Sequence, residues 1–126
     1  MERKISRGDM FYADLAPGLG SEQYGRRPCV VVSNDAGNRH SNTVIVAMIT
    51  SKVETKAKIP THCQVKAQQG LVRDSLVLLE QLRTIDKMRL LEYLGTLGAG
   101  DMDRVAEALA ASVGLVSEGG NHNEAH

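Results

Sequence analysis

Thr43-Val44-Ile45-Val46-Ala47-Met48-Ile49 is the stretch of sequence that decides the fold class. Its β-branched and apolar side chains predict a β-strand. The apolar run is continuous rather than alternating, which predicts a strand buried on both faces of a sheet. Pro28-Cys29-Val30-Val31-Val32-Ser33 repeats the pattern, and we expect a second such strand there.

Further strands are expected on either side of this pair. Polar, glycine-rich segments separate them, as is typical of turns. Five short strands joined by loops predict a small barrel or sandwich, and closing the sheet would remove most of its exposed edges. The expected strands are 10–15, 28–33, 43–49, 61–65 and 75–79, with 93–97 as a candidate sixth and a short turn at 86–89.

The end of the chain predicts a helix. Asp101 is one candidate N-cap; alternatively Gly100 caps the helix and Asp101 favours its dipole. An apolar stripe at helical spacing follows, formed by Met102, Val105, Ala106, Leu109 and Val113. We therefore expect a mainly β fold with one C-terminal helix, a single domain over residues 1–116, and a disordered tail over 117–126.

The charge is balanced overall but unevenly distributed. The 126 residues carry 15 Lys+Arg and 15 Asp+Glu, for a net charge of zero. This balance argues against a protein that holds nucleic acid by bulk positive charge, and against an acidic disordered activator. Residues 1–75 nevertheless hold 11 basic and 7 acidic side chains, leaving +4, and residues 76–126 balance them with −4. An anionic ligand near the first part is one interpretation, and ordinary surface charge is the other.

Cys29 and Cys63 are expected to be buried thiols rather than a disulfide. The sequence begins without an apolar signal-peptide region, and no apolar run approaches the ~20 residues that span a bilayer. These features predict a cytoplasmic protein without a membrane partner. No phosphate loop, dinucleotide fingerprint or zinc-ligand spacing is present, so neither a cofactor nor a metal is expected.

Two segments have the residue types that an anion site needs. Gly20–Pro28 is a long polar loop, and Pro28 restricts Arg27 to an extended backbone that directs its guanidinium. Thr50 and Ser51 follow directly on the buried strand 43–49. An arginine fork and a hydroxyl that converge can hold a phosphate. An exposed arginine and a turn threonine are the alternative interpretation.

Several motifs together resemble the MazF/PemK/Kid family, the toxins of bacterial type II toxin–antitoxin modules. The likeness extends over roughly residues 5–116. The motifs that carry it are Arg7–Leu15, Gly20–Gln23, Gly25–Pro28, Val32–Asp35, Thr43–Ala47, Ile49–Ser51, Arg73–Ser75 and Glu80–Lys87, together with the final helix. Tyr24, which is bulky for its loop, departs from the family pattern.

The resemblance implies a small SH3-like β-barrel with a C-terminal helix that forms a homodimer. It also implies a sequence-specific endoribonuclease toxin that cuts single-stranded RNA, such as mRNA, without metal by attack of the 2′-hydroxyl. Arg27 and Thr50 match the catalytic pair of the family. The general base remains open among Glu22, a water molecule and His40.

With only four aromatic residues in the chain, polar groups are expected to read the RNA bases. The candidate substrate-binding residues are Arg7, Ser21, Glu22, Gln23, Asn34, Ser75, Glu80, Gln81 and Arg83. The resemblance also implies a cognate antitoxin, with operator DNA bound only through the complex with it. Two other functions remain open: a protein-binding toxin that resembles gyrase poisons, and a non-catalytic binding module.

Overall fold

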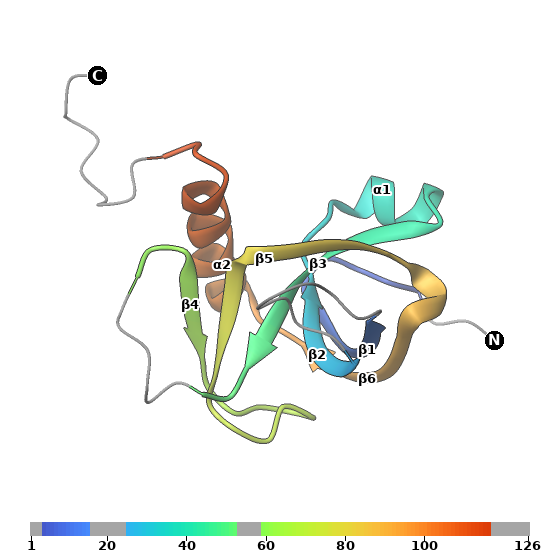
Figure 1. Cartoon of the computed structure of the whole chain (residues 1–126), viewed down its shortest axis with the longest axis horizontal. Coiled ribbons are helices and arrows are strands. Elements are labelled where there is room, and N and C mark those ends of the chain that lie inside the picture. The colour runs from blue at the N-terminus through green and yellow to red at the C-terminus, as the bar shows by residue number, and fades with distance from the viewer. Residues whose placement is uncertain (1–3, 16–24, 53–58, 117–126) are drawn as a thin grey trace.

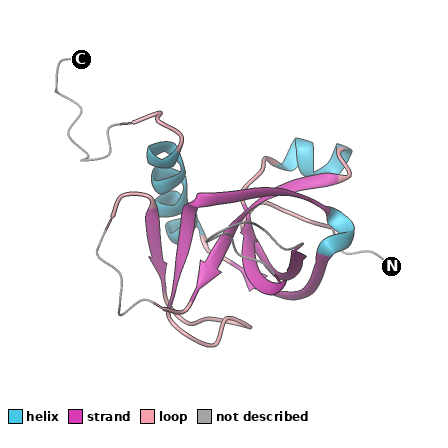
Figure 2. Ribbon diagram, viewed as in Figure 1, coloured by secondary structure: helices cyan, strands magenta, loops and turns pink. Residues whose placement is uncertain are grey.

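A computed structural model describes residues 4–15, 25–52 and 59–116 of the chain (Figure 1). These residues form one antiparallel sheet with two α-helices (Figure 2). In chain order the elements are β1 (Asp9–Leu15), β2 (Gly25–Val31), α1 (Asp35–His40), β3 (Thr43–Thr50), β4 (His62–Val65), β5 (Ser75–Asp86), the 3₁₀ turn η1 (Lys87–Arg89), β6 (Leu90–Thr96) and α2 (Ala99–Ser112).

The strand order across the sheet is β4-β5-β3-β2-β1-β6, and every pair of neighbours is antiparallel. The mainly β fold with a C-terminal helix is thereby confirmed, including the sixth strand. In the described part of the chain the strands curl into a barrel-like shape without closing, so β4 and β6 are the two edges (Figure 1).

The expectation that a strand ends at residue 79 is wrong, because β5 continues to Asp86. Ala47 of β3 faces Leu82 of β5, but the next residue, Met48, faces Leu78. Residues 79–81 therefore form an irregularity in the ladder, and such bulges bend a strand. The polar pair Glu80-Gln81 falls at this bulge. The sequence pattern there is interrupted although the strand is not.

Burial on both faces is confirmed for residues 29–32 and 46–49, whereas Ile45, in the first half of β3, is exposed. Met10, Val30 and Ala47 belong to one core cluster, which also contains Val105 of α2. The residues that follow the first three in the chain (Phe11, Val31 and Met48) belong to a second cluster on the other face. Side chains alternate between the two faces of a strand, so each strand contributes to both clusters. The rigid two-sided core fixes the strand ends where the candidate site lies.

Helix α2 lies beside β4 and β5 at one end of the molecule (Figure 1). Its N-cap is Gly98, without a side-chain hydrogen bond, so the expected caps at Gly100 and Asp101 are wrong. Val105, Ala108 and Ala111 are its buried residues, whereas Ala106 and Val113 are exposed. The helix begins two residues before the first acidic side chain, at Ala99, where no sequence signal marks a start.

The polar segment 34–38, which contains Gly37, is typical of a turn, but the structure places the short helix α1 at Asp35–His40. Asn34 caps it by accepting a hydrogen bond from the backbone N–H of Gly37 at 2.7 Å. Cys29 and Cys63 are both buried and free, as expected. Burial raises the pKa of the Cys29 thiol to about 12 and also raises that of Cys63.

No helix in the described ranges has the length and apolar character needed to cross a membrane. The expected location in the cytoplasm stays a prediction. The expected tail over residues 117–126 lies outside the described residues, and the domain boundary at 116 likewise stays a prediction.

Candidate functional site

The antiparallel pairing of β2 with β3 places the two residues that were singled out as a catalytic pair at the same end of the sheet. Cys29 of β2 faces Met48 of β3 in an antiparallel pair. This is the last pair of the β2–β3 ladder at this end, and Arg27 and Thr50 each lie two residues beyond it on their own strands. Because the strands are antiparallel, both residues lie at the same end of the sheet.

Both residues line one cavity of about 280 Å³. Pro28, Ile49 and Leu94 supply apolar walls, and the segment 70–73 closes another side. Ser51, Lys52 and Ser75 add polar groups. The cavity is thus a mixed pocket at the ends of β2 and β3, with a rigid sheet behind it.

The hydroxyl of Thr50 has a hydrogen that it can donate in a hydrogen bond. Thr50 is half-buried, and its Oγ1 accepts a hydrogen bond from the backbone N–H of Lys52 at 3.3 Å. This bond uses an oxygen lone pair and leaves the hydroxyl proton for an acceptor in the cavity. Arg27 is exposed and presents a guanidinium, which has donors only. The pair thus offers donors to a negatively charged oxygen.

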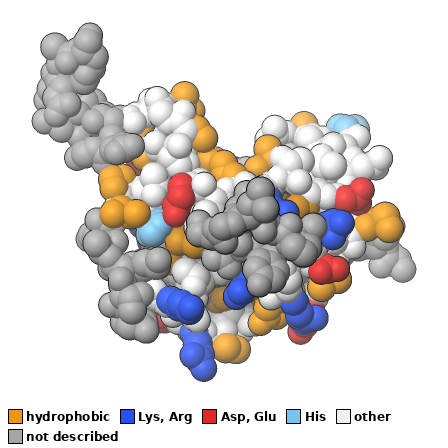
Figure 3. Space-filling model, viewed as in Figure 1, with side chains coloured by type: hydrophobic (Ala, Val, Ile, Leu, Met, Phe, Trp, Pro, Cys, Tyr) orange, Lys and Arg blue, Asp and Glu red, His pale blue; other side chains and the backbone are white. Residues whose placement is uncertain are grey.

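The cavity is electrostatically positive. Arg27, Lys52 and Arg73 line it, and no acidic side chain does so among the described residues. Viewed as in Figure 3, Lys and Arg side chains gather along the lower edge of the molecule, around the end of β3. Such a site favours an anion.

Tyr12 forms part of the same cavity and is its one described aromatic side chain. The guanidinium of Arg26 lies 4.5 Å from the centre of the Tyr12 ring and also pairs with Glu92 at 2.6 Å. Arg26 itself does not line the cavity. These contacts hold Arg26 beside the ring of Tyr12, whereas its neighbour Arg27 lines the cavity.

Two of the predicted substrate-binding residues have structural partners elsewhere. The guanidinium of Arg7 donates to the carbonyl oxygen of Val32, and its backbone N–H donates to Asp35 at 2.7 Å. This second bond holds the pKa of Asp35 below its usual value. Asn34 caps α1. Neither Arg7 nor Asn34 lines the cavity, so the structure does not bring them to the proposed pair.

Ser75 does line the cavity, and it is buried, with its hydroxyl donating to the carbonyl of Arg73 at 2.8 Å. Glu80 pairs instead with His62, Oε2 to Nε2, at 3.0 Å. The side-chain oxygen of Gln81 is buried without a hydrogen-bond partner in the described part of the chain. Arg83 is half-buried on β5 opposite Val46. Among these four, only Ser75 reaches the cavity.

The remaining candidates fall into two groups. Ser21, Glu22, Gln23 and Tyr24 lie outside the described residues. His40, a candidate general base, is exposed at the end of α1 and does not line the cavity. The described residues of the cavity therefore include no carboxylate and no imidazole, and Glu22 and water remain as candidates for the base.

Lys52 and Arg73 were not among the predicted site residues, although both line the cavity. A signal for Lys52 was present, because it follows the hydroxyl pair at the strand end. Arg73 belongs to one of the motifs that carry the family resemblance, Arg73–Ser75, but no local pattern indicates that its side chain lies at the site. Its place depends on how the turn at 66–74 packs against β6, a contact between distant parts of the chain.

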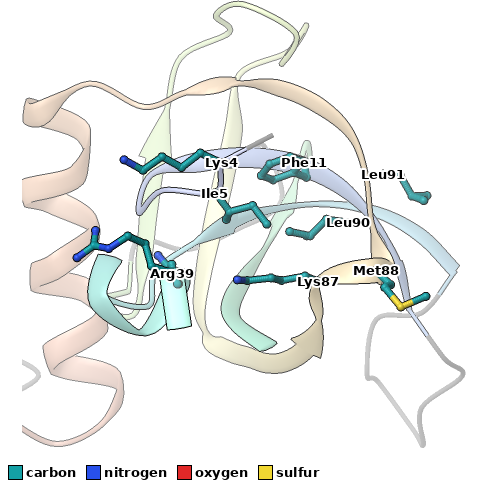
Figure 4. A pocket seen from close by; sticks show the side chains of 9 residues that line it. Lys4, Ile5, Phe11, Arg39, Lys87, Met88, Leu90 and Leu91 are labelled. Carbon is teal, nitrogen blue, oxygen red and sulfur yellow. The ribbon is translucent and has the colours of Figure 1, made fainter. Parts of the chain in front are cut away.

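A second cavity, of about 560 Å³, lies away from this pair, between the N-terminal segment, α1 and η1 (Figure 4). It is larger, but its lining combines Lys4, Arg39 and Lys87 with apolar side chains and offers no hydroxyl beside a cation. In the described ranges, no three His, Cys, Asp or Glu side chains gather as a candidate metal site. The smaller cavity is the better candidate for chemistry.

The structure is that of a small β protein with a curled antiparallel sheet, which presents an arginine and a threonine at adjoining strand ends as a candidate site for a phosphate-type anion. Comparison with known proteins is more specific. Residues 6–113 match the family described as PemK-like, MazF-like toxin of type II toxin–antitoxin system. The chain belongs to this family.

Individual relatives agree with the family match. Endoribonuclease EndoA of Bacillus subtilis (strain 168) is 51% identical over 113 residues, which cover 89% of this chain and 97% of that protein. A mycobacterial endoribonuclease, solved in complex with its cognate antitoxin, is 32% identical and superposes with a TM-score of 0.71 over 87% of this chain and 95% of that one. MazF from Deinococcus radiodurans has a TM-score of 0.75 at 25% identity and covers 90% of this chain and 99% of its own.

Proposed function

We propose that this chain is an endoribonuclease toxin of a toxin–antitoxin module, which cleaves single-stranded RNA such as mRNA in a sequence-specific way. The observation that carries the proposal is that Arg27 and Thr50 both line one positively charged cavity. The family match and the endoribonuclease relative support it. Cleavage of transcripts would inhibit translation and growth.

In the proposed reaction the 2′-hydroxyl of one nucleotide attacks the adjacent phosphorus. The P–O5′ bond breaks, leaving a 2′,3′-cyclic phosphate on one product and a 5′-hydroxyl on the other. The proton lost by the 2′-hydroxyl goes to a base, and the leaving oxygen gains one. Negative charge grows on the non-bridging phosphate oxygens in the transition state. Arg27 and Thr50 donate hydrogen bonds to these oxygens, and no metal is required.

Arg27 is assigned charge stabilisation, because a guanidinium is protonated at all relevant pH values and cannot serve as a base. Removing one such preorganised donor costs about 10²–10³ in rate. Arg27→Ala and Thr50→Val are therefore expected to cut RNA about 10²–10³ times more slowly than the wild type. Thr50→Ser keeps the hydroxyl and is expected to retain most of the activity.

The experiment incubates each purified protein with a transcript in EDTA, and sequencing of the 5′ ends of the products identifies the cleavage motif. Arg26→Ala is the matched control, since Arg26 is the adjacent arginine but does not line the cavity. A wild type that fails to cut in EDTA contradicts the metal-independent mechanism. An Arg27→Ala variant that cuts as well as the wild type contradicts the assignment of the catalytic pair.

A cognate antitoxin and a second copy of this chain are the proposed protein partners, with operator DNA bound only through the antitoxin complex. A protein-binding toxin, similar to gyrase poisons, is the rival function. The apolar side chains exposed at the end of α2, Val113, Leu115 and Val116, are the observation in its favour. Growth arrest that survives Arg27→Ala but is lost on truncation of α2 would support this rival.

A further inference from the structure

The turn between β4 and β5 forms one wall of the candidate site. Gln68 and Leu71 pair as an isolated bridge through two backbone hydrogen bonds of 2.8 Å each. Between them, Gln69 adopts a positive φ of 52°, which side chains rarely tolerate. This tight reversal places Gly70, Leu71, Val72 and Arg73 along the cavity.

The same turn is fastened to the edge strand β6. The side-chain amide of Gln69 donates from Nε2 to the carbonyl of Thr96 at 2.9 Å and accepts the Thr96 N–H on Oε1 at 3.0 Å. The backbone N–H of Gly70 adds a bond to the carbonyl of Leu94 at 2.7 Å. The Gln69 amide thereby pairs with β6 as a neighbouring strand would.

Gly95 is the residue that makes this contact sterically feasible. It has a φ of +127°, and a Cβ there would come within 2.7 Å of the Gln69 side chain. Gly70 is equally close-packed, because a Cβ on it would lie 2.8 Å from the carbonyl oxygen of Leu94. The contact of Gln69 with β6, which we call the Gln69 clamp, thus depends on two glycines and leaves the turn little freedom to move away.

Arg73 lies just beyond the Gln69 clamp, and its backbone is held on its C-terminal side. The hydroxyl of Ser75 donates to the Arg73 carbonyl at 2.8 Å. The carboxylate of Asp74 is occupied by the backbone N–H of Ala67 at 2.9 Å. Arg73 is exposed and lines the cavity together with Arg27 and Thr50. A long cation on a fixed backbone therefore stands beside the proposed catalytic pair.

We propose that Arg73 binds a phosphodiester of the RNA next to the one that is cleaved, and that Gln69 is a positioning residue which holds Arg73 in place. The inference rests on the proposed function, because it names a further phosphate site in the same substrate groove. A single strand presents one negative charge per nucleotide, so a second cation beside the scissile phosphate meets its neighbour. Arg73 acts on binding rather than on the chemical step.

Steady-state kinetics and equilibrium binding test this role. Arg73→Gln is expected to raise KM about tenfold while kcat changes much less. Loss of a phosphate contact weakens the binding of the RNA equally in the ground state and in the transition state. Binding is measured with a 2′-O-methylated copy of a cleaved transcript segment, which the enzyme cannot cut. A plot of log Kd against log salt concentration is expected to be less steep for this variant than for the wild type, by about 0.7 in slope.

Arg73→Lys keeps the charge and is expected to restore most of the affinity and the salt slope. Arg39→Gln is the control, since Arg39 is also exposed but belongs to the other cavity. An unchanged Kd and salt slope for Arg73→Gln would overturn the proposal. So would a loss confined to kcat, which would place Arg73 in the chemical step instead.

Gln69→Ala tests the positioning role. It is expected to raise KM in the same direction as Arg73→Gln, and the double variant is expected to be little worse than Arg73→Gln alone, because both changes act through one contact. Full additivity would show that Gln69 acts independently of Arg73. If the wild type does not cleave RNA, the proposed function fails, and if Arg27→Ala and Thr50→Val retain full cleavage, its catalytic pair is wrong. The Kd measurements on Arg73→Gln test this inference separately from both.

Discussion

At the residue scale, the contact between His62 and Glu80 joins the first residue of β4 to the bulge of β5. Only 8% of the His62 side chain is exposed, against 40% for Glu80. Burial disfavours the charged form of Glu80 and so raises its pKa. The hydrogen bond with His62 and several smaller contributions together lower the pKa by more than burial raises it. The pKa of Glu80 therefore lies below its usual value of 4.5. A carboxyl whose pKa is lowered by folding stabilises the folded state at pH values above its unfolded pKa.

Glu80→Gln removes this charge while keeping the side-chain shape. The wild type is expected to be more stable than the variant at pH 6. The difference should shrink as the pH falls below about 4.5 and through the lower folded pKa, where Glu80 becomes protonated. Chemical denaturation at a series of pH values measures the difference in the free energy of unfolding.

Glu107→Gln is the matched control for loss of a carboxylate, because Glu107 is exposed on α2. Its free energy of unfolding at pH 6 should stay within about 0.5 kcal/mol of the wild type. A stability difference for Glu80→Gln that is constant from pH 6 to pH 3 would contradict the assigned ionic contribution.

The residues of the candidate site differ in how far they could be predicted. Arg27 and Thr50 could be singled out as candidates, because a proline and a strand end are local signals, but only the family resemblance identified them as a catalytic pair. Arg7 could not be assigned, since the partner of its guanidinium is a carbonyl 25 residues away in the chain. Arg73 was missed for a similar reason, because its position depends on bonds between Gln69 and Thr96, which are 27 residues apart.

At the element scale, α2 contributes to the core through one narrow face. Val105 is fully buried, with 0% of its surface exposed, in the cluster that also contains Met10 and Ala47. Val113, at the end of the same helix, is 53% exposed. The two valines are therefore chemically identical side chains in opposite environments.

Val105→Ala is expected to reduce the free energy of unfolding by about 2 kcal/mol, because it removes buried methyl groups and leaves a cavity. Val113→Ala is expected to change it by less than about 0.5 kcal/mol. Thermal or denaturant unfolding of the two variants provides the comparison. Equal effects would show that α2 does not pack on the sheet as described.

The elements also show where sequence patterns stop being informative. The predicted strands 43–49 and 10–15 each fall only one residue short of β3 and β1, because continuous or alternating apolar runs give a clear period. β5 was cut short in the prediction because its bulge places polar residues in mid-strand. Helix α1 was missed because it is only six residues long and its signal is a single cap, Asn34. Tertiary packing, rather than local preference, decides such elements.

At the scale of the whole molecule, a net charge of zero coexists with a positive cavity. The cations Arg27, Lys52 and Arg73 lie in the first part of the chain, whose balance is +4. The acidic second part compensates for them without contributing a described carboxylate to the cavity lining. Neutrality of the chain therefore excludes a non-specific cationic binder but not a nucleic-acid enzyme.

Added salt should weaken the binding of RNA, with a log–log slope of about −2 if each of the three cations meets one phosphate of a single strand. Binding of an acidic antitoxin should weaken as well, because salt screens exposed charges. Fluorescence anisotropy of labelled RNA and titration calorimetry with the antitoxin, between about 0.05 and 0.5 M salt, measure both trends. Affinities that do not change with salt would contradict the electrostatic part of the proposed function.

The two buried cysteines lie on opposite faces of the sheet, Cys63 in the cluster with α2 and Cys29 in the other. Alkylating reagents attack the thiolate, and burial disfavours that form at both positions. Modification of either thiol therefore reports an opening of the structure around it. The natural chain thus contains one internal chemical probe for each side of its core, and peptide mass spectrometry during labelling can time the two openings separately.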